Sequence, residues 1–506
     1  MKVVLERREA LVGAYDASVS GFFERTDKDE PLPRLLQAED AAVGGTLTHA
    51  WKARDFKGKA KEVTVLVRPD GRGRVALVGL GRRPLTPDGI REAAAAVVQK
   101  LKGRGVRTLS FRLATFAVEG IPGDEAVRAL AAGALLGGYE FLRYKSSGDG
   151  GVEEVTIALG AEHSREEGSL RRVLDQELLL AESCLFSRDL ANTPPNTATP
   201  EWLAEETRRL GRELGLKVQV FDEKKLAEMN CGGLLAVGGG SVHPPRLVVI
   251  EYPGGARSGK TVCVVGKGIT FDSGGISLKP SSGMADMKFD KSGACAVLGI
   301  VRAAARLKAP PRVIGILACA ENLPSGSAYR PSDVVRTHNG MTIEVLDTDA
   351  EGRVVLADAL AYAVERYHPD EVIDLATLTG AAVVALGEYL GVLIGTEETL
   401  AEGLERAGRS VGERVWRLPL TDPHREMVRS DVADVRNIVE PRVAGSLIGA
   451  AFLEPFVGGR PWAHLDIAGP AWSRKGSLKW APAYQPVGAT GFGVRLVARY
   501  LLDGAK

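Results

Sequence analysis

The second half of the chain carries strand-length runs of apolar residues that alternate with helical segments. We predict strands at Arg246–Glu251, Thr261–Val265, Arg312–Ala318, Ile343–Leu346 and Val372–Leu375, and helices at Gly293–Leu307 and Arg353–Tyr367. Strands that are apolar along most of their length must be covered on both faces. The pattern therefore predicts an α/β fold with a mostly parallel central sheet between layers of helices.

The N-terminal third shows a second, smaller α/β pattern. The predicted strands are Val63–Val67, Val75–Leu80 and Arg107–Leu113, and the predicted helices are Asp88–Leu101 and Ala126–Tyr139. The glycines at Gly79 and Gly81 follow a strand, but the third glycine of a dinucleotide-binding loop is missing, so we interpret them as a turn. A chain of 506 residues exceeds the size of one hydrophobic core. We predict an N-terminal domain at residues 1–165, a linking helix and Pro-rich turn at 166–200, and a larger C-terminal domain at 201–506.

Composition excludes several classes of protein. The 65 basic and 64 acidic residues give a net charge of +1, which provides no general attraction to nucleic acid or to anionic membranes. The five cysteines form no C-x-x-C pair, so we expect neither a disulfide framework nor a zinc ribbon. Charged residues from Glu6 onward interrupt the N-terminus, and no apolar run is long enough to cross a bilayer. We expect a cytoplasmic protein with no membrane partner.

Three loops that follow predicted strands contain polar residues that could bind ligands or take part in catalysis. Val264–Pro280 places Lys267, Asp272 and Lys279 in a glycine-rich turn. Met284–Ala294 contains Asp286 and Asp290, and Glu344–Leu360 contains Asp347, Asp349, Glu351 and Arg353. In open parallel sheets, ligands bind in the loops after the carboxyl ends of the strands. We therefore expect these loops to form one site.

Clustered carboxylates repel one another in a cleft of low dielectric constant, and bound cations remove that repulsion. Two divalent cations could activate a water and polarise a carbonyl group, which predicts a two-metal hydrolase. The alternative is that the loops hold solvated carboxylates and helix caps, with Asp290 capping the helix near Gly293.

The sequence lacks the motifs of other common hydrolases. There is no H-E-x-x-H or G-x-S-x-G motif, and none of the seven histidines lies in the three loops.

Two long strings in this region resemble a known family. VGKGITFDSGGISLK in Val265–Lys279 and TDAEGR at Thr348–Arg353 resemble the signatures of the leucine aminopeptidases, the cytosolic M17-type metallopeptidases. Shorter matches are NTPPN (Asn192–Asn196), GGLLAVGGGSVHPPRLVVIEY (Gly232–Tyr252), ATLTGA (Ala376–Ala381), HLDIAGPAW (His464–Trp472) and GATGFGVRLV (Gly488–Val497). The resemblance covers the chain from about Asn192 to the C-terminus.

The resemblance implies a set of metal ligands. One divalent cation would be held by Asp272, Asp349 and Glu351, with help from the backbone carbonyl of Asp349. The other would be held by Lys267, Asp272, Asp290 and Glu351. Zinc or manganese is expected, with magnesium or cobalt as alternatives, because carboxylate-rich sites accept all four.

The resemblance also implies catalytic and substrate-binding roles. A metal-bridging water would attack the scissile carbonyl, Lys279 would stabilise the oxyanion, and Arg353 would hold a bicarbonate as general base. The residues expected to contact the substrate are Met287, Asp347, Thr377, Leu378, Gly380 and Ala468. Two positions depart from the family pattern: Asp347 replaces the usual Asn, and Lys291-Ser292-Gly293-Ala294 replaces the usual MGGA.

The resemblance predicts an aminopeptidase that releases Leu and other apolar N-terminal residues from peptides, assembled as a homohexamer. Two alternatives remain open. One is a narrow dipeptidase, for example on cysteinylglycine. The other is a DNA-binding or regulatory protein of the same fold, although the mixed charges near the N-terminus show no basic stripe and we do not expect nucleic-acid binding.

Overall fold

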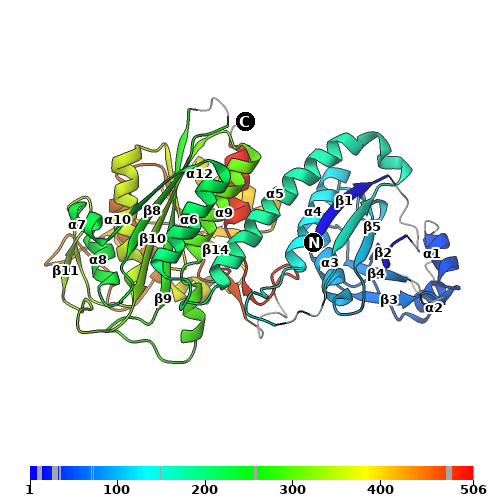
Figure 1. The fold of residues 1–506 in the computed structure, drawn as a ribbon, viewed down its shortest axis with the longest axis horizontal. Coiled ribbons are helices and arrows are strands. Elements are labelled where there is room, and N and C mark those ends of the chain that lie inside the picture. The colour runs from blue at the N-terminus through cyan, green and yellow to red at the C-terminus, as the bar shows by residue number, and fades with distance from the viewer. Residues whose placement is uncertain are drawn as a thin grey trace. The chain divides into compact units, whose positions relative to one another are not determined.

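The computed structural model describes residues 1–7, 14–25, 32–33, 36–69, 71, 73–146, 148, 150–255, 259–474 and 481–504. They form two compact units. One contains the described residues of Met1–Glu182 and Leu478–Pro486, and the other contains those of Ser183–Ser477 and Val487–Lys506. Both are α/β, which confirms the predicted fold class (Figure 1).

The smaller unit is built on a six-stranded sheet with the strand order β1-β6-β5-β2-β4-β3. All neighbouring strands are parallel except β3 and β4. Its elements are β1 Lys2–Glu6, β2 Ala17–Phe23, α1 Gln37–Ala42, α2 Thr46–Ala53, β3 Val63–Val67, β4 Arg74–Gly81, α3 Pro87–Leu101, β5 Thr108–Arg112, α4 Gly123–Gly137, β6 Glu154–Ala158 and the first part of α5 Glu167–Asn192. Helices α3 and α4 approach closely at Gly133, where a Cβ would lie 2.3 Å from the carbonyl oxygen of Arg91.

The larger unit is built on an eight-stranded sheet with the order β15-β14-β17-β13-β9-β10-β8-β7. The central strands β17, β13, β9 and β10 are parallel, while β7, β8 and the β14–β17 pair are antiparallel. The strands are β7 Lys217–Phe221, β8 Arg246–Tyr252, β9 Thr261–Asp272, β10 Arg312–Asn322, β13 Glu371–Ala376, β14 Gly391–Gly395, β15 Val415–Arg417 and β17 Trp462–Asp466. Smaller sheets contain β11 Val334–Arg336, β12 Thr342–Glu344, β16 Val435–Arg436, β18 Trp472–Ser473 and β19 Gly488–Ala489.

All the helices from α6 to α15 belong to the larger unit. They are α6 Pro200–Leu214, α7 Glu223–Glu228, α8 Gly232–Gly238, α9 Ser292–Leu307, α10 Glu351–Tyr367, α11 Gly380–Leu386, α12 Glu398–Val411, α13 Asp422–Met427, α14 Gly445–Leu453 and α15 Val494–Asp503. The 3-10 helices η4 and η5 span Met284–Phe289 and Glu454–Val457. No helix in the described part of the chain has both the length and the apolar character that crossing a membrane requires.

Most strands and helices predicted from the sequence are present. Strands β9 and β10 continue further than predicted, to Asp272 and Asn322, where the two residues are register partners. Strand β12 is shorter than the predicted Ile343–Leu346, because the N–H of Leu346 donates to the side chain of Asn437 instead of to a neighbouring strand.

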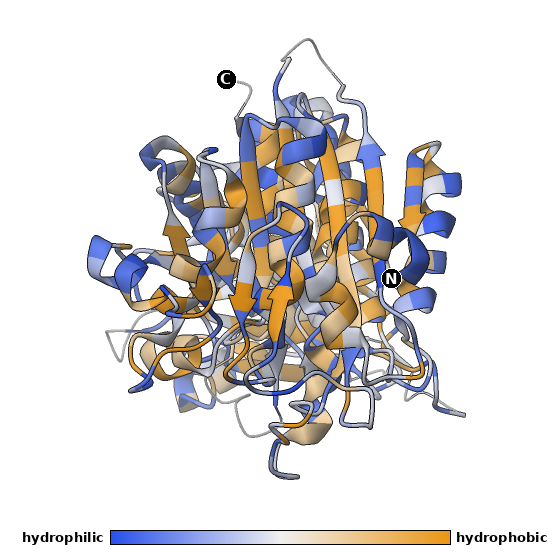
Figure 2. Cartoon of the chain, turned by 90° about the vertical axis from the view of Figure 1, so that its left-hand side faces the viewer, coloured by the Kyte–Doolittle hydropathy of each residue, from blue (hydrophilic) through white to orange (hydrophobic). Residues whose placement is uncertain are grey.

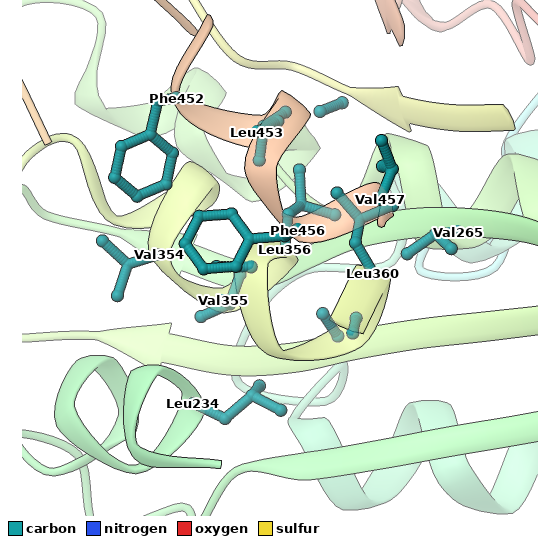
Figure 3. Close-up of a cluster of buried hydrophobic side chains, with 14 of the residues drawn as sticks. Leu234, Val265, Val354, Val355, Leu356, Leu360, Phe452, Leu453, Phe456 and Val457 are labelled. Atoms are coloured by element: carbon teal, nitrogen blue, oxygen red, sulfur yellow. The ribbon is translucent and has the colours of Figure 1, made fainter. Parts of the chain in front are cut away.

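The core of the larger unit lies on both faces of its sheet. Figure 2 shows hydrophobic residues along the central strands and hydrophilic residues gathered on the outer helices. In Figure 3, Val355 and Leu356 of α10 lie close to Phe456 of η5, and Leu360 lies beside Val457. These side chains are almost completely buried. Helix α10 thus packs against η5 as well as against strands β9 and β10, and this packing fixes the position of Glu351 at the start of the helix.

Candidate metal centre

Three carboxylates from three different elements converge in the larger unit. Asp272 is the last residue of β9, Asp290 follows η4 directly, and Glu351 is the first residue of α10. One carboxylate oxygen from each lies within 4.8 Å of the others, and all three side chains are buried. The structure therefore brings together residues that are up to 79 positions apart in the sequence.

Lys267 lies beside this triad. Its Nζ is 2.8 Å from Asp290 Oδ1 and 2.8 Å from Glu351 Oε1, and it donates to the carbonyl of Thr377 at 2.9 Å. Burial lowers the pKa of Lys267, but the charges of Asp290, Glu351 and Asp272 outweigh burial and raise it. An ammonium group has no lone pair, so Lys267 can act as a ligand only where cations lower its pKa.

The triad is not satisfied by its own protein partners. Among the described residues, Asp290 Oδ2 and Glu351 Oε1 accept no hydrogen bond, although Glu351 Oε1 is near the Lys267 ammonium. Burial and the charge of Asp272 raise the pKa of Glu351 to about 8, and burial also raises the pKa of Asp290. Buried carboxylates that repel one another and keep unpaired oxygens suit a cation. The donor set therefore fits divalent metal ions.

The capping role considered for Asp290 is not observed. Lys291 occupies the N-cap position of α9, and no side chain caps that helix. The Asp290 carboxylate instead accepts from the Thr377 hydroxyl at 2.7 Å and pairs with Lys267.

Lys279 and Asp349 flank the triad. Lys279 Nζ lies 2.8 Å from Asp272 Oδ2 and also contacts Asp349 Oδ1. Burial and the charge of Asp272 raise the pKa of Asp349 to about 6. Asp272 is positioned by Asn322, whose side-chain amide donates to Asp272 Oδ1 at 2.9 Å. Asn322 was not predicted, because no motif spacing connects the end of β10 with the end of β9.

Arg353 is buried on the first turn of α10. Its Nη1 donates to the carbonyl of Asn437 at 2.8 Å, while its Nε has no hydrogen-bond partner in the described part of the chain. Burial lowers the pKa of Arg353 to about 10, so the side chain remains cationic at neutral pH. An unpaired donor on a buried cation is suited to binding an anion.

A cavity of about 530 Å³ opens beside these groups. Of the six residues predicted to contact a substrate, Asp347, Leu378 and Gly380 line it, together with Asp349 and Arg353. The other predicted residues do not line this cavity: Met287 lies in η4, Thr377 binds Asp290, and Ala468 is buried.

Asp466, at the end of β17, holds the loop that borders the cavity. Its Oδ1 accepts from the N–H of Leu378 at 3.1 Å, and its Oδ2 accepts from the Thr379 hydroxyl at 2.6 Å. Asp466 lies within the string HLDIAGPAW, but the sequence analysis gave it no role. A carboxylate inside a buried strand was a possible signal, because such a group needs a specific partner.

Comparisons with known proteins agree with this geometry. The family model described as "Cytosol aminopeptidase family, catalytic domain" matches residues 185–498, and "Cytosol aminopeptidase family, N-terminal domain" matches residues 12–148. A probable cytosol aminopeptidase of Roseiflexus castenholzii is 44% identical over 99% of this chain and 99% of its own length. The cytosol aminopeptidase of Pseudomonas aeruginosa is 43% identical over 94% of each chain.

The fold also matches a solved structure. The bottromycin maturation enzyme BotP in complex with Mn superposes with a TM-score of 0.84 and 38% sequence identity, covering 97% of this chain and 100% of that one. The metal in that structure agrees with the fit of the buried carboxylates to a divalent cation. The chain therefore belongs to the cytosol aminopeptidase family, and it is an exopeptidase that uses divalent metal to hydrolyse peptides.

Proposed function

We propose that this protein is a two-metal aminopeptidase that removes Leu and other apolar residues from the N-termini of peptides. The observation that carries the proposal is the buried triad of Asp272, Asp290 and Glu351, in which Asp290 and Glu351 share one lysine and each keeps an oxygen that accepts no hydrogen bond from the described residues. The triad lies beside a cavity lined by Asp349 and Arg353. Such an arrangement is costly to fold unless it binds cations.

The ligands that we propose follow from the family resemblance and the observed positions. Asp272 and Glu351 would bridge the two cations. Asp349 would complete one site, with its backbone carbonyl, and Asp290 and Lys267 would complete the other. We propose zinc or manganese as the metals, with magnesium and cobalt as alternatives. When bound, the two cations would supply a nucleophilic water and polarise the scissile carbonyl.

Lys279 is proposed to stabilise the oxyanion that forms on the scissile carbonyl. Its side chain is mostly buried and lies between Asp272 and Asp349, so its ammonium is oriented by the same carboxylates that would hold the cations. A cation that is already positioned can stabilise developing negative charge without reorganisation during the reaction.

Arg353 is proposed to hold a bicarbonate ion that accepts a proton from the attacking water. Its unpaired Nε and its position on the cavity wall support this role. Apolar cavity residues such as Leu378, Val439 and Ile448 support a preference for apolar side chains.

Hydrolysis of a leucine anilide in the presence of Mn²⁺ or Zn²⁺ tests the proposal. We expect turnover by the metal-loaded protein, and we expect Glu351→Ala to abolish it while the circular dichroism spectrum stays unchanged. The matched control is Glu365→Ala, which removes a glutamate from the exposed side of the same helix. A folded, metal-loaded wild-type protein without turnover would contradict the proposal.

We also propose that the protein is cytoplasmic and forms homohexamers. Both proposals rest on the family resemblance, and the names of the relatives support the first. Light scattering tests the second, and a monomer at micromolar concentration would contradict it.

A further inference from the structure

Arg442 lies in the cavity wall next to the candidate metal centre. It belongs to the loop between β16 and α14, and it lines the cavity with Asp347, Asp349 and Arg353. Its Nη2 donates to Asp347 Oδ2 at 2.6 Å. The two paired residues are 95 positions apart in the sequence. One of them, Asp347, is the position where the chain departs from the usual Asn.

Asp347 is a rigid anchor for Arg442. Its side chain is only 8% exposed, and its second oxygen, Oδ1, accepts from the N–H of Asp349 at 2.9 Å. Its backbone carbonyl accepts from the side-chain amide of Asn437 at 2.6 Å. Each carboxylate oxygen therefore already accepts one hydrogen bond, and these bonds fix the orientation of the Asp347 side chain toward Arg442.

Arg442, in contrast, is accessible. Its side chain is 67% exposed, and of its five N–H donors one bonds to Asp347, while its Nε lies 3.7 Å from the carboxylate of Glu440. The anion Asp347 is buried behind the guanidinium, whereas Glu440 is as exposed as Arg442 and competes with a substrate carboxylate for it. The planar arrangement of donors in arginine matches the two oxygens of a carboxylate.

We propose that Arg442, positioned by Asp347, binds a carboxylate of the peptide substrate. The proposal rests on the proposed aminopeptidase function and adds a determinant of specificity to it. Two sources present this chemistry: the free C-terminus of a short peptide, and an acidic side chain near the cleaved bond. A cavity of about 530 Å³ is of the size that encloses small ligands. We expect the C-terminus of a dipeptide or tripeptide to reach the cavity wall and that of a long peptide to lie outside the cavity.

Two matched pairs of substrates separate the two sources. The first pair is Leu-Gly and its C-terminal amide, and the second is Leu-Asp-amide and Leu-Asn-amide. For wild-type protein we expect kcat/KM to be about fivefold higher for the member with the carboxylate in at least one pair, as suits an exposed charge pair. The difference is expected in KM, because the contact is made equally before and during the reaction.

Variants of Arg442 assign the preference to this residue. Arg442→Gln is expected to reduce the ratio to about one, and Arg442→Lys, which keeps the charge, is expected to retain part of it. Asp347→Asn is expected to lower the ratio as well, because it weakens the anchor. A role of Arg442 in folding alone would change both members of each substrate pair equally.

Equal rates for both members of both pairs in wild-type protein would overturn the proposal, and so would a preference that persists in Arg442→Gln. Absence of turnover on leucine anilide is a different failure, because it overturns the proposed function itself. In that case, calorimetric binding of Leu-Gly and its amide to wild-type and Arg442→Gln protein still tests the residue. Equal affinities in the wild type would then refute the carboxylate contact.

Discussion

Two buried glutamates of the larger unit, Glu413 and Glu351, are equally hidden from solvent but differently partnered. Glu413 Oε2 accepts from the N–H groups of Gly493 and Leu496 at 2.9 and 3.0 Å, and its Oε1 pairs with Arg495. Glu351 shares its site with two other carboxylates, and its Oε1 accepts no hydrogen bond within the described structure. The first carboxylate is satisfied by an arginine and two backbone N–H groups, while the second is paired only with one lysine ammonium that it shares with Asp290. This difference distinguishes a structural charge from a functional one.

The largest expected effect concerns Glu413. Glu413→Ala removes the partner of a buried arginine and two hydrogen bonds at the N-terminus of α15. We expect the free energy of unfolding to fall by about 3–5 kcal/mol. Urea denaturation measures this change, and activity per folded molecule should be retained. A loss of activity without a loss of stability would contradict the structural role of Glu413.

The next effect separates two lysines near the candidate metal centre, the partly buried Lys279 and the fully buried Lys291. Lys279→Met should lower kcat by about 10²–10³-fold, because it removes a positioned cation from the oxyanion. The control is Lys291→Met, since Lys291 is fully buried but donates to the carbonyls of Thr193 and Lys288 and not to the triad. Steady-state kinetics on leucine anilide provide the comparison. Equal losses in the two variants would refute a specific role for Lys279.

A smaller effect is expected when Glu351 is changed in metal-free protein. Glu351→Gln keeps the shape of the side chain, removes the remaining negative charge of a carboxyl group whose raised pKa already favours its neutral form, and weakens the contact with Lys267. These changes oppose each other, so stability should change by less than about 1 kcal/mol. Chemical denaturation in the presence of a chelator measures it. A cost as large as that of Glu413→Ala would show that Glu351 is structural.

The smallest effect is a pH dependence at His464. This histidine is fully buried, and its Nδ1 lies 2.7 Å from Asp374 Oδ1. Burial lowers the pKa of His464, but the charge of Asp374 outweighs burial and raises the pKa above 6.5. The pair therefore stabilises the fold fully below pH 6.5, and this contribution is lost as the pH rises through the pKa of the folded state.

Replacing the histidine tests that dependence. His464→Gln should remove the decline in unfolding free energy above pH 6.5, and thermal unfolding measured across that range shows whether it does. An unchanged slope in the variant would assign the dependence to another group.

Several strongly apolar strands were predicted from the sequence, although the apolar strand β14 was not, and prediction was poorer where strands contain polar residues. Strands β8, β9 and β10 are nearly continuous apolar runs and were predicted. Strand β17 was not, because His464 and Asp466 interrupt its apolar pattern, and their partners Asp374 and Thr379 are known only from the folded chain. The domain boundaries at residues 165 and 200 stay predictions.

The candidate site was predictable as a set of loops but not as a network. The position of loops after strand ends predicted that Asp272, Asp290 and Glu351 would lie together, and the structure places them together. The roles of Asn322, Asp466 and Arg442 depend on contacts between residues 50 to 95 positions apart, which spacing along the chain does not encode. The roles assigned to Lys279, Arg353 and the substrate-binding residues stay predictions until the variants are measured.

The central claim is that the buried triad exists to hold cations. Calorimetric titration of chelator-treated protein with Mn²⁺, together with the unfolding midpoint at each step, tests it most directly. We predict two binding events per chain and a rise in stability of about 2.7 kcal/mol for each site at which free Mn²⁺ reaches 100 times the dissociation constant. Glu351→Gln should lose most of both effects, while Glu365→Gln should keep them. Binding and stabilisation that are undiminished in Glu351→Gln, or absent from the wild type, would contradict the claim.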